Sequence, residues 1–370
     1  MRVIIAGGGI VGLSAGIAFK AIGWDVLVCE QAPEIRAAGA AIGLWRNALD
    51  VFSAFGIGNA IAAISTPVET WFYDARGHRQ RAAGYGIEDH RFQLLPRPEL
   101  NRCLAEAVGP SHIHLNAKVV SFVEHASHIE ATLSNGQVES ADLLVGADGA
   151  YSAVRAQLVP GYSAQEHRGH HVWRGMLESG GEPEEGSILT VGHERTRGGY
   201  TRTYGNQVVW MVNQFESPTP SGTLKEQALK RAAHLNENGW NDALVALIER
   251  TPESAILHNP IMFVPALPRW TSSRVALIGD AAHALSPHIS AGGTLGVEDV
   301  LVLTRAIQHT ASLGQALTHY ESNRIPHYAR VHELAYAVEQ ARNAEEYARE
   351  YVRFSHWMLN EGYQASRAPF

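Results

Sequence analysis

The chain has 370 residues, of which 45% are hydrophobic and 18% are charged, close to the usage of ordinary globular proteins. This composition excludes a disordered chain, a collagen-like repeat and a coiled coil. The formal net charge of -7 gives no basic field that would attract phosphate groups, so we expect neither nucleic acid nor a membrane as a partner. The two cysteines, Cys29 and Cys103, are far apart and have no metal-binding or disulfide spacing, which fits a cytoplasmic protein.

The N-terminal segment has the pattern of a βαβ unit. It predicts an apolar strand over residues 3–6, a helix over residues 10–22 and a second strand over residues 25–30. Further buried strands are predicted over residues 143–147 and 275–278, because these runs are too short and too apolar for amphipathic helices. A parallel sheet assembled from separated segments is therefore expected.

The pattern changes after residue 166 to alternating β-branched and aromatic residues, which is typical of antiparallel strands. Beyond Gly296 it is helical almost to the end. We therefore predict an α/β protein in which a Rossmann-like parallel-sheet domain is interleaved with a mostly antiparallel β-sheet domain and followed by C-terminal helices. The predicted limits are 1–70, 98–165 and 270–340 for the first domain, 71–97 and 166–269 for the second, and 341–370 for the C-terminal helical segment.

A glycine motif follows the first predicted strand. Gly7, Gly9 and Gly12 have the spacing of a dinucleotide-binding turn at the start of a helix. Glycines there permit the tight turn, the close approach of a pyrophosphate and the packing of the helix on the strand. Glu30 ends the second strand, where a carboxylate suits a ribose hydroxyl and repels a 2′-phosphate. The motif predicts a dinucleotide site but does not distinguish FAD from NAD.

Three further motifs follow in order: Arg97-Pro98-Glu99-Leu100, the segment Asp142 to Arg155 that contains Asp148-Gly149, and the segment Arg274 to His283 that contains Gly279-Asp280. With the glycine motif, they resemble those of the class A flavoprotein monooxygenases, the family of para-hydroxybenzoate and salicylate hydroxylases. The resemblance covers residues 1–326. The chain departs from the family pattern in the loop that begins at Pro287, where Ala291 stands at the position usually held by glutamine.

This resemblance implies a non-covalently bound FAD, with NADH or NADPH docking transiently and without a Rossmann domain of its own. It implies that Arg97 contacts the ribityl and phosphate region of the flavin, that Asp280 contacts the ribityl chain, and that Gly292 and Gly293 lie beside the isoalloxazine. The residues predicted to bind the cofactor are Gly7, Gly9, Val11, Gly12, Glu30, Gln31, Arg97, Val119, Asp148, Gly279, Asp280, Pro287, Gly292 and Gly293.

The implied reaction is hydroxylation of a small aromatic or heteroaromatic substrate by a flavin C4a-hydroperoxide, with O2 and NAD(P)H consumed. A base or proton relay near a ring hydroxyl would assist it. Among polar and aromatic residues of the predicted strands we take Tyr200 and His193, and then Tyr204, as candidate catalytic residues, with Trp210, Trp45, Gly43 and His288 as candidate substrate contacts. No metal is predicted, since the cluster His167, His170 and His171 has no fourth ligand at a recognisable spacing.

Other functions of the same fold stay open. Epoxidation and Baeyer-Villiger oxidation use the same flavin chemistry with another substrate pose, and a flavin reductase or dehydrogenase would need no oxygen. A flavin halogenase is disfavoured, because no two of the eight tryptophans are two residues apart. A non-catalytic FAD-binding protein is disfavoured by the intact Asp148-Gly149 and Gly279-Asp280 motifs. The family resemblance also implies a homodimer.

Overall fold

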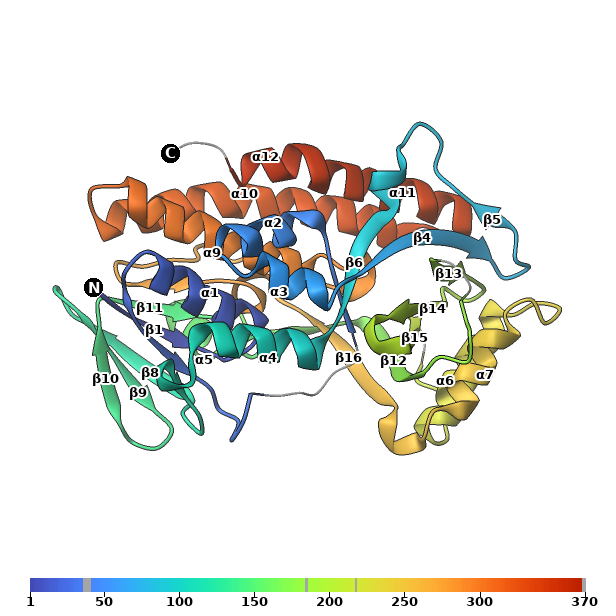
Figure 1. Cartoon of the computed structure of the whole chain (residues 1–370), viewed down its shortest axis with the longest axis horizontal. Coiled ribbons are helices and arrows are strands. Elements are labelled where there is room, and N and C mark those ends of the chain that lie inside the picture. Colours follow the sequence, from blue (N-terminus) through green and yellow to red (C-terminus); the bar gives the residue numbers. More distant parts are fainter. Residues whose placement is uncertain (36–40, 184–185, 217, 368–370) are drawn as a thin grey trace.

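The structure is a computed structural model that describes residues 1–35, 41–183, 186–216 and 218–367. Its strands form a five-stranded, a nine-stranded and a three-stranded sheet, and long C-terminal helices run along the top of the view across the larger two (Figure 1). The predicted fold class, a Rossmann-like parallel sheet interleaved with a mostly antiparallel sheet, is confirmed. No helix in the described ranges is long and apolar enough to cross a membrane.

The five-stranded sheet is wholly parallel and has the strand order β17-β11-β1-β2-β7. Its strands are β1 (Arg2–Ala6), β2 (Asp25–Cys29), β7 (Ile113–His114), β11 (Leu143–Gly146) and β17 (Val275–Leu277). The βαβ unit and both distant strands of this sheet lie where the apolar runs predicted them. A parallel sheet covered on both faces requires strands that are apolar on both sides, which these short runs provide.

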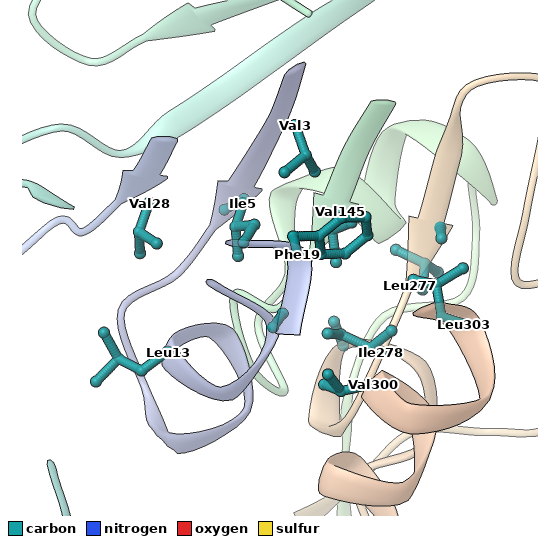
Figure 2. Packing of buried hydrophobic residues seen from close by; sticks show 14 of the residues in the cluster. Val3, Ile5, Leu13, Phe19, Val28, Val145, Leu277, Ile278, Val300 and Leu303 are labelled. Atoms are coloured by element: carbon teal, nitrogen blue, oxygen red, sulfur yellow. The ribbon is translucent and has the colours of Figure 1, made fainter. Parts of the chain in front are cut away.

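Helices α1 (Ile10–Ala21) and α9 (Gly292–His309) cover one face of the parallel sheet. Figure 2 shows Phe19 of α1 and Val300 and Leu303 of α9 beside the apolar side chains of Val145, Ile278 and Leu277. The three-stranded antiparallel sheet contacts β1 and β11. It consists of β8 (Val119–Glu124), β9 (Ile129–Leu133) and β10 (Val138–Ala141).

The nine-stranded sheet has the order β16-β12-β15-β14-β13-β4-β6-β3, with β5 paired to β4. All neighbours are antiparallel except β13 and β4. The strands are β3 (Ala41–Leu44), β4 (Thr66–Asp74), β5 (Arg79–Gln80), β6 (Arg91–Pro96), β12 (Gln165–Glu178), β13 (Ser187–Val191), β14 (Arg197–Thr203), β15 (Gln207–Gln214) and β16 (Leu257–Phe263). β3 and the start of β4 join this sheet, whereas the sequence pattern places residues 41–70 in the other domain, so the exact domain limits stay a prediction.

The remaining helices connect or cover these sheets. α6 and α7 pack on one face of the nine-stranded sheet. α11 packs on the other face of this sheet, and α10 packs against α9 and α11. Their bounds are α2 (Arg46–Ala54), α3 (Gly58–Ala63), α4 (Arg97–Val108), α5 (Ala153–Leu158), α6 (Leu224–Ala232), α7 (Asp242–Arg250), α8 (Asp280–His283), α10 (Leu313–Gln340), α11 (Ala344–Trp357) and α12 (Tyr363–Ala365).

Candidate active site

A pocket of about 430 Å³ opens at the carboxyl edge of the parallel sheet. The chain leaves β1, β2 and β11 at this edge, so residues that are distant in sequence meet there. Among the residues predicted to bind the cofactor, the pocket brings together Gly7, Gly9, Glu30, Gln31, Arg97, Val119 and Asp148. Val11 and Gly12 do not line it, and the loop residues from Gly279 to Gly293 form a separate group.

The three glycines of the first turn have different physical roles. A Cβ atom on Gly7, whose φ is +104°, would lie 2.4 Å from the Ala147 carbonyl oxygen, and one on Gly12 would lie 1.9 Å from the Gly7 carbonyl oxygen. The fold itself therefore requires these two glycines. A Cβ atom on Gly9 would meet no described atom within 4 Å. The space beside Gly9 lies at the N-terminus of α1, where free backbone amides and the helix dipole favour an anion such as a pyrophosphate.

Polar groups around the pocket fit a dinucleotide. The Glu30 carboxylate accepts hydrogen bonds from the Gly8 amide at 2.7 Å and the Ala32 amide at 2.8 Å, so it holds the glycine turn as well as facing the pocket. Asp148 caps α5 through one oxygen, whereas its buried Oδ1 has no hydrogen-bond partner in the described chain. The same holds for the buried Nε of Arg97. An unused donor and an unused acceptor lining one pocket match a ligand with phosphates and ribose hydroxyls.

A second group of predicted cofactor residues surrounds the turn after β17. Gly279 has a φ of +58° and precedes the exposed Asp280 at the start of α8. A Cβ atom on Gly292 would lie 3.8 Å from Asp280 Oδ1, so these two residues are adjacent. Pro287 begins the short turn that leads to Gly292. Close backbone approach along this loop suits the flat, extended flavin portion of FAD.

Two packing contacts hold the second group in place. Val11 would be 3.1 Å from a Cβ atom on Gly279 and 2.4 Å from one on Gly296, so it joins the glycine turn to α9. Gly293 packs closely on Ile42 of β3, since a Cβ atom there would be 2.8 Å from its Cδ1. Val11, Gly12 and Gly293 thus have structural roles that sequence spacing alone cannot separate from ligand contact.

A buried ionic network lies beneath the Gly279 turn and was not predicted from the sequence. The Asp299 carboxylate accepts hydrogen bonds from the Gly279 amide at 2.8 Å, His283 Nε2 at 2.6 Å and Arg324 Nε at 2.7 Å. Burial raises the pKa of Asp299, but His283 and Arg324 outweigh this effect and hold it below its ordinary value. The network fixes the turn that carries Asp280.

One face of β14 presents a buried arginine toward the C-terminal helices. Arg197 Nη2 donates to the carbonyl oxygens of Glu339 at 2.7 Å and Ala341 at 3.0 Å. Its guanidinium lies over the rings of Phe215 and Tyr347, 4.8 and 4.6 Å from the centroids. Nε and Nη1 are buried and have no hydrogen-bond partner among the described residues. A cation with two unused donors suits a substrate oxygen or ring nitrogen that carries negative charge.

Two histidines near Arg197 are linked through Ser286. His288 Nδ1 is 2.7 Å and His170 Nδ1 is 3.1 Å from Ser286 Oγ, while His288 Nε2 is 3.1 Å from the Ala335 carbonyl oxygen. Burial and the positive charge of Arg197 lower the pKa of His288 to about 4, and burial together with the nearby imidazoles and Arg197 lowers the pKa of His170 to about 2. Both imidazoles are therefore neutral at pH 7.

The partners of these histidines assign their tautomers. Because a carbonyl only accepts, His288 carries its proton on Nε2 and accepts the Ser286 hydroxyl proton at Nδ1. Ser286 then accepts from a protonated Nδ1 of His170. This leaves His170 Nε2 as a buried lone pair, and it has no partner in the described ranges. The chain of three groups can therefore accept a hydrogen bond from a ligand beside the loop that begins at Pro287.

The three residues predicted to be catalytic are not part of this group. Tyr200 lies on the opposite face of β14 and packs with the cluster under α6 and α7, and burial raises its pKa to about 12, away from a base at neutral pH. Tyr204 is 47% exposed in the turn after β14. His193 is exposed and hydrogen bonds to Glu237. We therefore do not assign the proton relay to these residues.

The predicted substrate contacts are divided in the same way. Trp210 packs with the cluster under α6 and α7 and donates its indole N–H to Thr251 at 2.8 Å, so it is a core residue. Trp45 is buried and its backbone amide donates to Thr294 Oγ1 at 3.0 Å. Gly43 is closed in by Phe92 and Ser290, each 3.1 Å from a Cβ atom placed there. Gly43, Trp45 and His288 thus surround the glycine loop of α9, while Trp210 does not.

The dinucleotide pocket, the Asp280 turn and the polar group on the antiparallel sheet together define a flavin-dependent oxidoreductase. A family model described as "FAD binding domain" matches residues 1–335. The aurachin C monooxygenase/isomerase of Stigmatella aurantiaca is 31% identical over 88% of this chain and 85% of its own. The FAD-dependent urate hydroxylase of Mycolicibacterium vanbaalenii is 28% identical over 88% and 84%.

Among solved structures, Klebsiella pneumoniae HpxO in complex with FAD and uric acid superposes with a TM-score of 0.83 and 25% identity, over 99% of this chain and 97% of that one. The chain belongs to the FAD-binding family of class A flavoprotein monooxygenases. It is an FAD-dependent monooxygenase, as the four sequence motifs predicted.

Proposed function

We propose that this enzyme hydroxylates a small aromatic or heteroaromatic substrate that carries an acidic hydroxyl or ring N–H group. NADH or NADPH supplies two electrons, one atom of O2 enters the substrate and the other leaves as water. When bound, FAD supplies the redox chemistry between the nicotinamide, O2 and the substrate. One observation carries the proposal: Arg197, with its unused donors, lies near the neutral, hydrogen-bonded chain of His170, Ser286 and His288.

Arg197 would bind the negative charge of a deprotonated substrate. Its Nη2 is held by two backbone carbonyls and its plane lies over two aromatic rings, so the orientation of its Nε and Nη1 donors is set before a ligand arrives. A preorganised donor loses little freedom on binding. Deprotonation makes the ring more electron-rich, which favours attack on an electrophilic oxygen.

The His170-Ser286-His288 chain would accept a hydrogen bond from the acidic hydroxyl or N–H group of the substrate. A neutral imidazole with a free lone pair accepts a hydrogen bond, and low pKa values keep both histidines neutral at pH 7. Ser286 orients this lone pair, because its hydroxyl accepts from His170 Nδ1 and donates to His288 Nδ1. The urate hydroxylase and HpxO comparisons support a heteroaromatic substrate, because uric acid is the compound that they name.

A substrate screen tests the proposed reaction. The flavin-loaded enzyme is mixed with NADH or NADPH and phenolic, benzoic, pyridine, purine and indolic compounds, while nicotinamide oxidation and O2 uptake are followed. We expect stimulated, O2-dependent oxidation and one labelled oxygen atom in the product under ¹⁸O2. An epoxide as product would show that the enzyme catalyses epoxidation, and an ester as product would show Baeyer-Villiger oxidation, in place of hydroxylation. Substrate reduction without O2 would refute the proposal in favour of a dehydrogenase.

Arginine variants on one strand test the proposed site. Arg197→Gln should lower kcat/KM roughly ten- to hundredfold, because a charged hydrogen bond contributes about 1.5–3 kcal/mol. Arg202→Gln is the matched control, since Arg202 lies on the other face of β14 and hydrogen bonds to the Gly181 carbonyl. Equal effects of both changes would contradict the assignment of Arg197. A large loss in Tyr200→Phe would instead support the residue that the sequence had suggested.

The compartment and assembly of the enzyme are separate proposals. We propose that it works in the cytoplasm, which its two widely separated cysteines support. A homodimer also remains a proposal. Sedimentation of the flavin-loaded protein would measure its assembly.

A further inference from the structure

The turn between β8 and β9 carries the sequence His125-Ala126-Ser127-His128-Ile129-Glu130. In the register of these strands Glu124 faces Ile129 and Val123 faces Glu130. His125 is therefore opposite His128, and its amide donates to the His128 carbonyl at 2.8 Å. Side chains alternate along a strand, so Glu130 lies on the same face as His128. The hairpin thus directs two imidazoles and a carboxylate to one side.

The ligand atoms of these three side chains converge. The two imidazole rings are stacked with centroids 4.4 Å apart and an interplanar angle of 12°. His125 Nε2 is 3.4 Å from Glu130 Oε2, and His128 Nε2 is 3.6 Å from Glu130 Oε1. One ligand atom from each side chain lies within 4.8 Å of the others. Each side chain remains about two-fifths exposed, so water can complete a coordination shell.

These separations suit a shared cation better than direct hydrogen bonds. Hydrogen bonds between nitrogen and oxygen usually span about 2.7–3.2 Å. In a tetrahedral site with bonds of about 2.0–2.1 Å, neighbouring ligand atoms are about 3.4 Å apart. We propose that His125, His128 and Glu130 bind a divalent first-row transition ion of the Zn²⁺ type. Imidazole nitrogen and carboxylate oxygen are both ordinary ligands of such ions.

The surroundings of the hairpin favour a preformed site. Ser127 Oγ is 3.2 Å from His128 Nδ1, which orients that ring from its other nitrogen. Arg274 donates to the carbonyl oxygens of Ala126 and Asp142, each at 2.9 Å, and so ties the turn to the parallel sheet. Within the described ranges, Glu130 forms ion pairs with the two histidines alone. A metal ion could therefore bind the Glu130 carboxylate without displacing a lysine or an arginine.

The proposed metal site is remote from the flavin pocket. Val119 at the start of β8 lines that pocket, whereas the turn begins six residues further on, about 20 Å along an extended strand. Figure 1 shows the three-stranded sheet at the opposite end of the molecule from α6 and α7. A bound ion would cross-link β8 and β9 and stabilise the hairpin without taking part in oxygen transfer. The inference is independent of the proposed function.

Zinc titration of the chelator-treated, flavin-loaded enzyme tests the site. By calorimetry we expect one Zn²⁺ per chain, with binding at least tenfold weaker in His125→Ala, His128→Ala and Glu130→Gln. His78→Ala is the matched control, because His78 is an exposed histidine paired with one carboxylate, Asp74, outside the hairpin. X-ray absorption at the zinc edge should show two imidazole nitrogens at about 2.0–2.1 Å.

Two results would overturn the inference. One is that the wild type binds Zn²⁺ no more tightly than the three hairpin variants do. The other is that tight binding persists in those variants and disappears in His258→Ala, which would assign the ion to the His171 and His258 pair, whose ring nitrogens are 3.2 Å apart. Flavin content and circular dichroism identify any variant that has failed to fold. NAD(P)H oxidation should be the same with and without zinc.

Discussion

Asp299→Asn removes the negative charge from the network that holds the Gly279 turn. Asp299 is fully buried and accepts from one backbone amide, one imidazole and one guanidinium. An asparagine side chain has only one acceptor oxygen, and its NH2 group would face at least one of these donors. Breaking a buried ion pair by removing one partner costs about 3–5 kcal/mol. We expect a loss of this size in the free energy of unfolding and weaker FAD binding, because the turn carries Asp280.

The dependence on pH gives this prediction a second measurement. The pKa of Asp299 is lower in the folded protein than its ordinary value. Its charged form therefore adds stability above the ordinary pKa of 3.8, and this contribution is lost as the pH falls below that value. Asp299→Asn should remove this part of the acid sensitivity.

Urea unfolding followed by circular dichroism, together with flavin titration, measures both effects. Asp25→Asn is the control, because Asp25 is 65% exposed and pairs with Arg2 at the surface. An exposed pair of this kind contributes about 0–1 kcal/mol. The reasoning is refuted if Asp299→Asn loses no more stability than Asp25→Asn and binds FAD as the wild type does.

Two further predictions separate ligand contact from packing and test the neutral histidines. Gly9→Val should change the unfolding free energy of the flavin-free protein by less than about 0.5 kcal/mol but weaken FAD binding, since Gly9 has a φ of -79° and free space at its Cβ position. Gly12→Ala should cost about 1–3 kcal/mol of stability, because its Cβ would meet the Gly7 carbonyl oxygen; similar affinities and stabilities for the two variants would contradict this difference. Stability should fall as the pH is lowered from about 6.5 toward 4, because the unfolded chain binds protons there that His170, with its pKa of about 2, does not. His170→Gln should reduce that slope in urea titrations, and an unchanged slope would show that other groups cause it.

The cofactor half of the site could be expected from the sequence because its residues stand next to strand ends. A parallel sheet places all carboxyl ends at one edge, so Gly7, Glu30 and Asp148 meet wherever the sheet forms. The same logic could not separate Gly9, which has free space beside it, from Gly12, which packs against the backbone. That distinction depends on which atoms approach within a few ångströms.

The substrate half could not be predicted in this way. Alternation along β14 indicates two faces, but it does not say which one meets α6 and α7 and which meets α10 and α11. Tyr200 and Arg197 are an odd number of residues apart, so they point to opposite faces, and the helices that cover each face come from later segments. The His170-Ser286-His288 chain likewise joins β12 to a loop more than a hundred residues away.

The amino-acid sequence by itself determined the flavin-binding fold, the dinucleotide turn and the family of this monooxygenase. These features depend on short-range spacing, because a strand, a glycine turn and a helix are adjacent in the chain. Only the tertiary structure decided which polar groups face the flavin loop and which aromatic residues are core. Burial and hydrogen-bond partners set those properties, and both come from segments that meet only after folding.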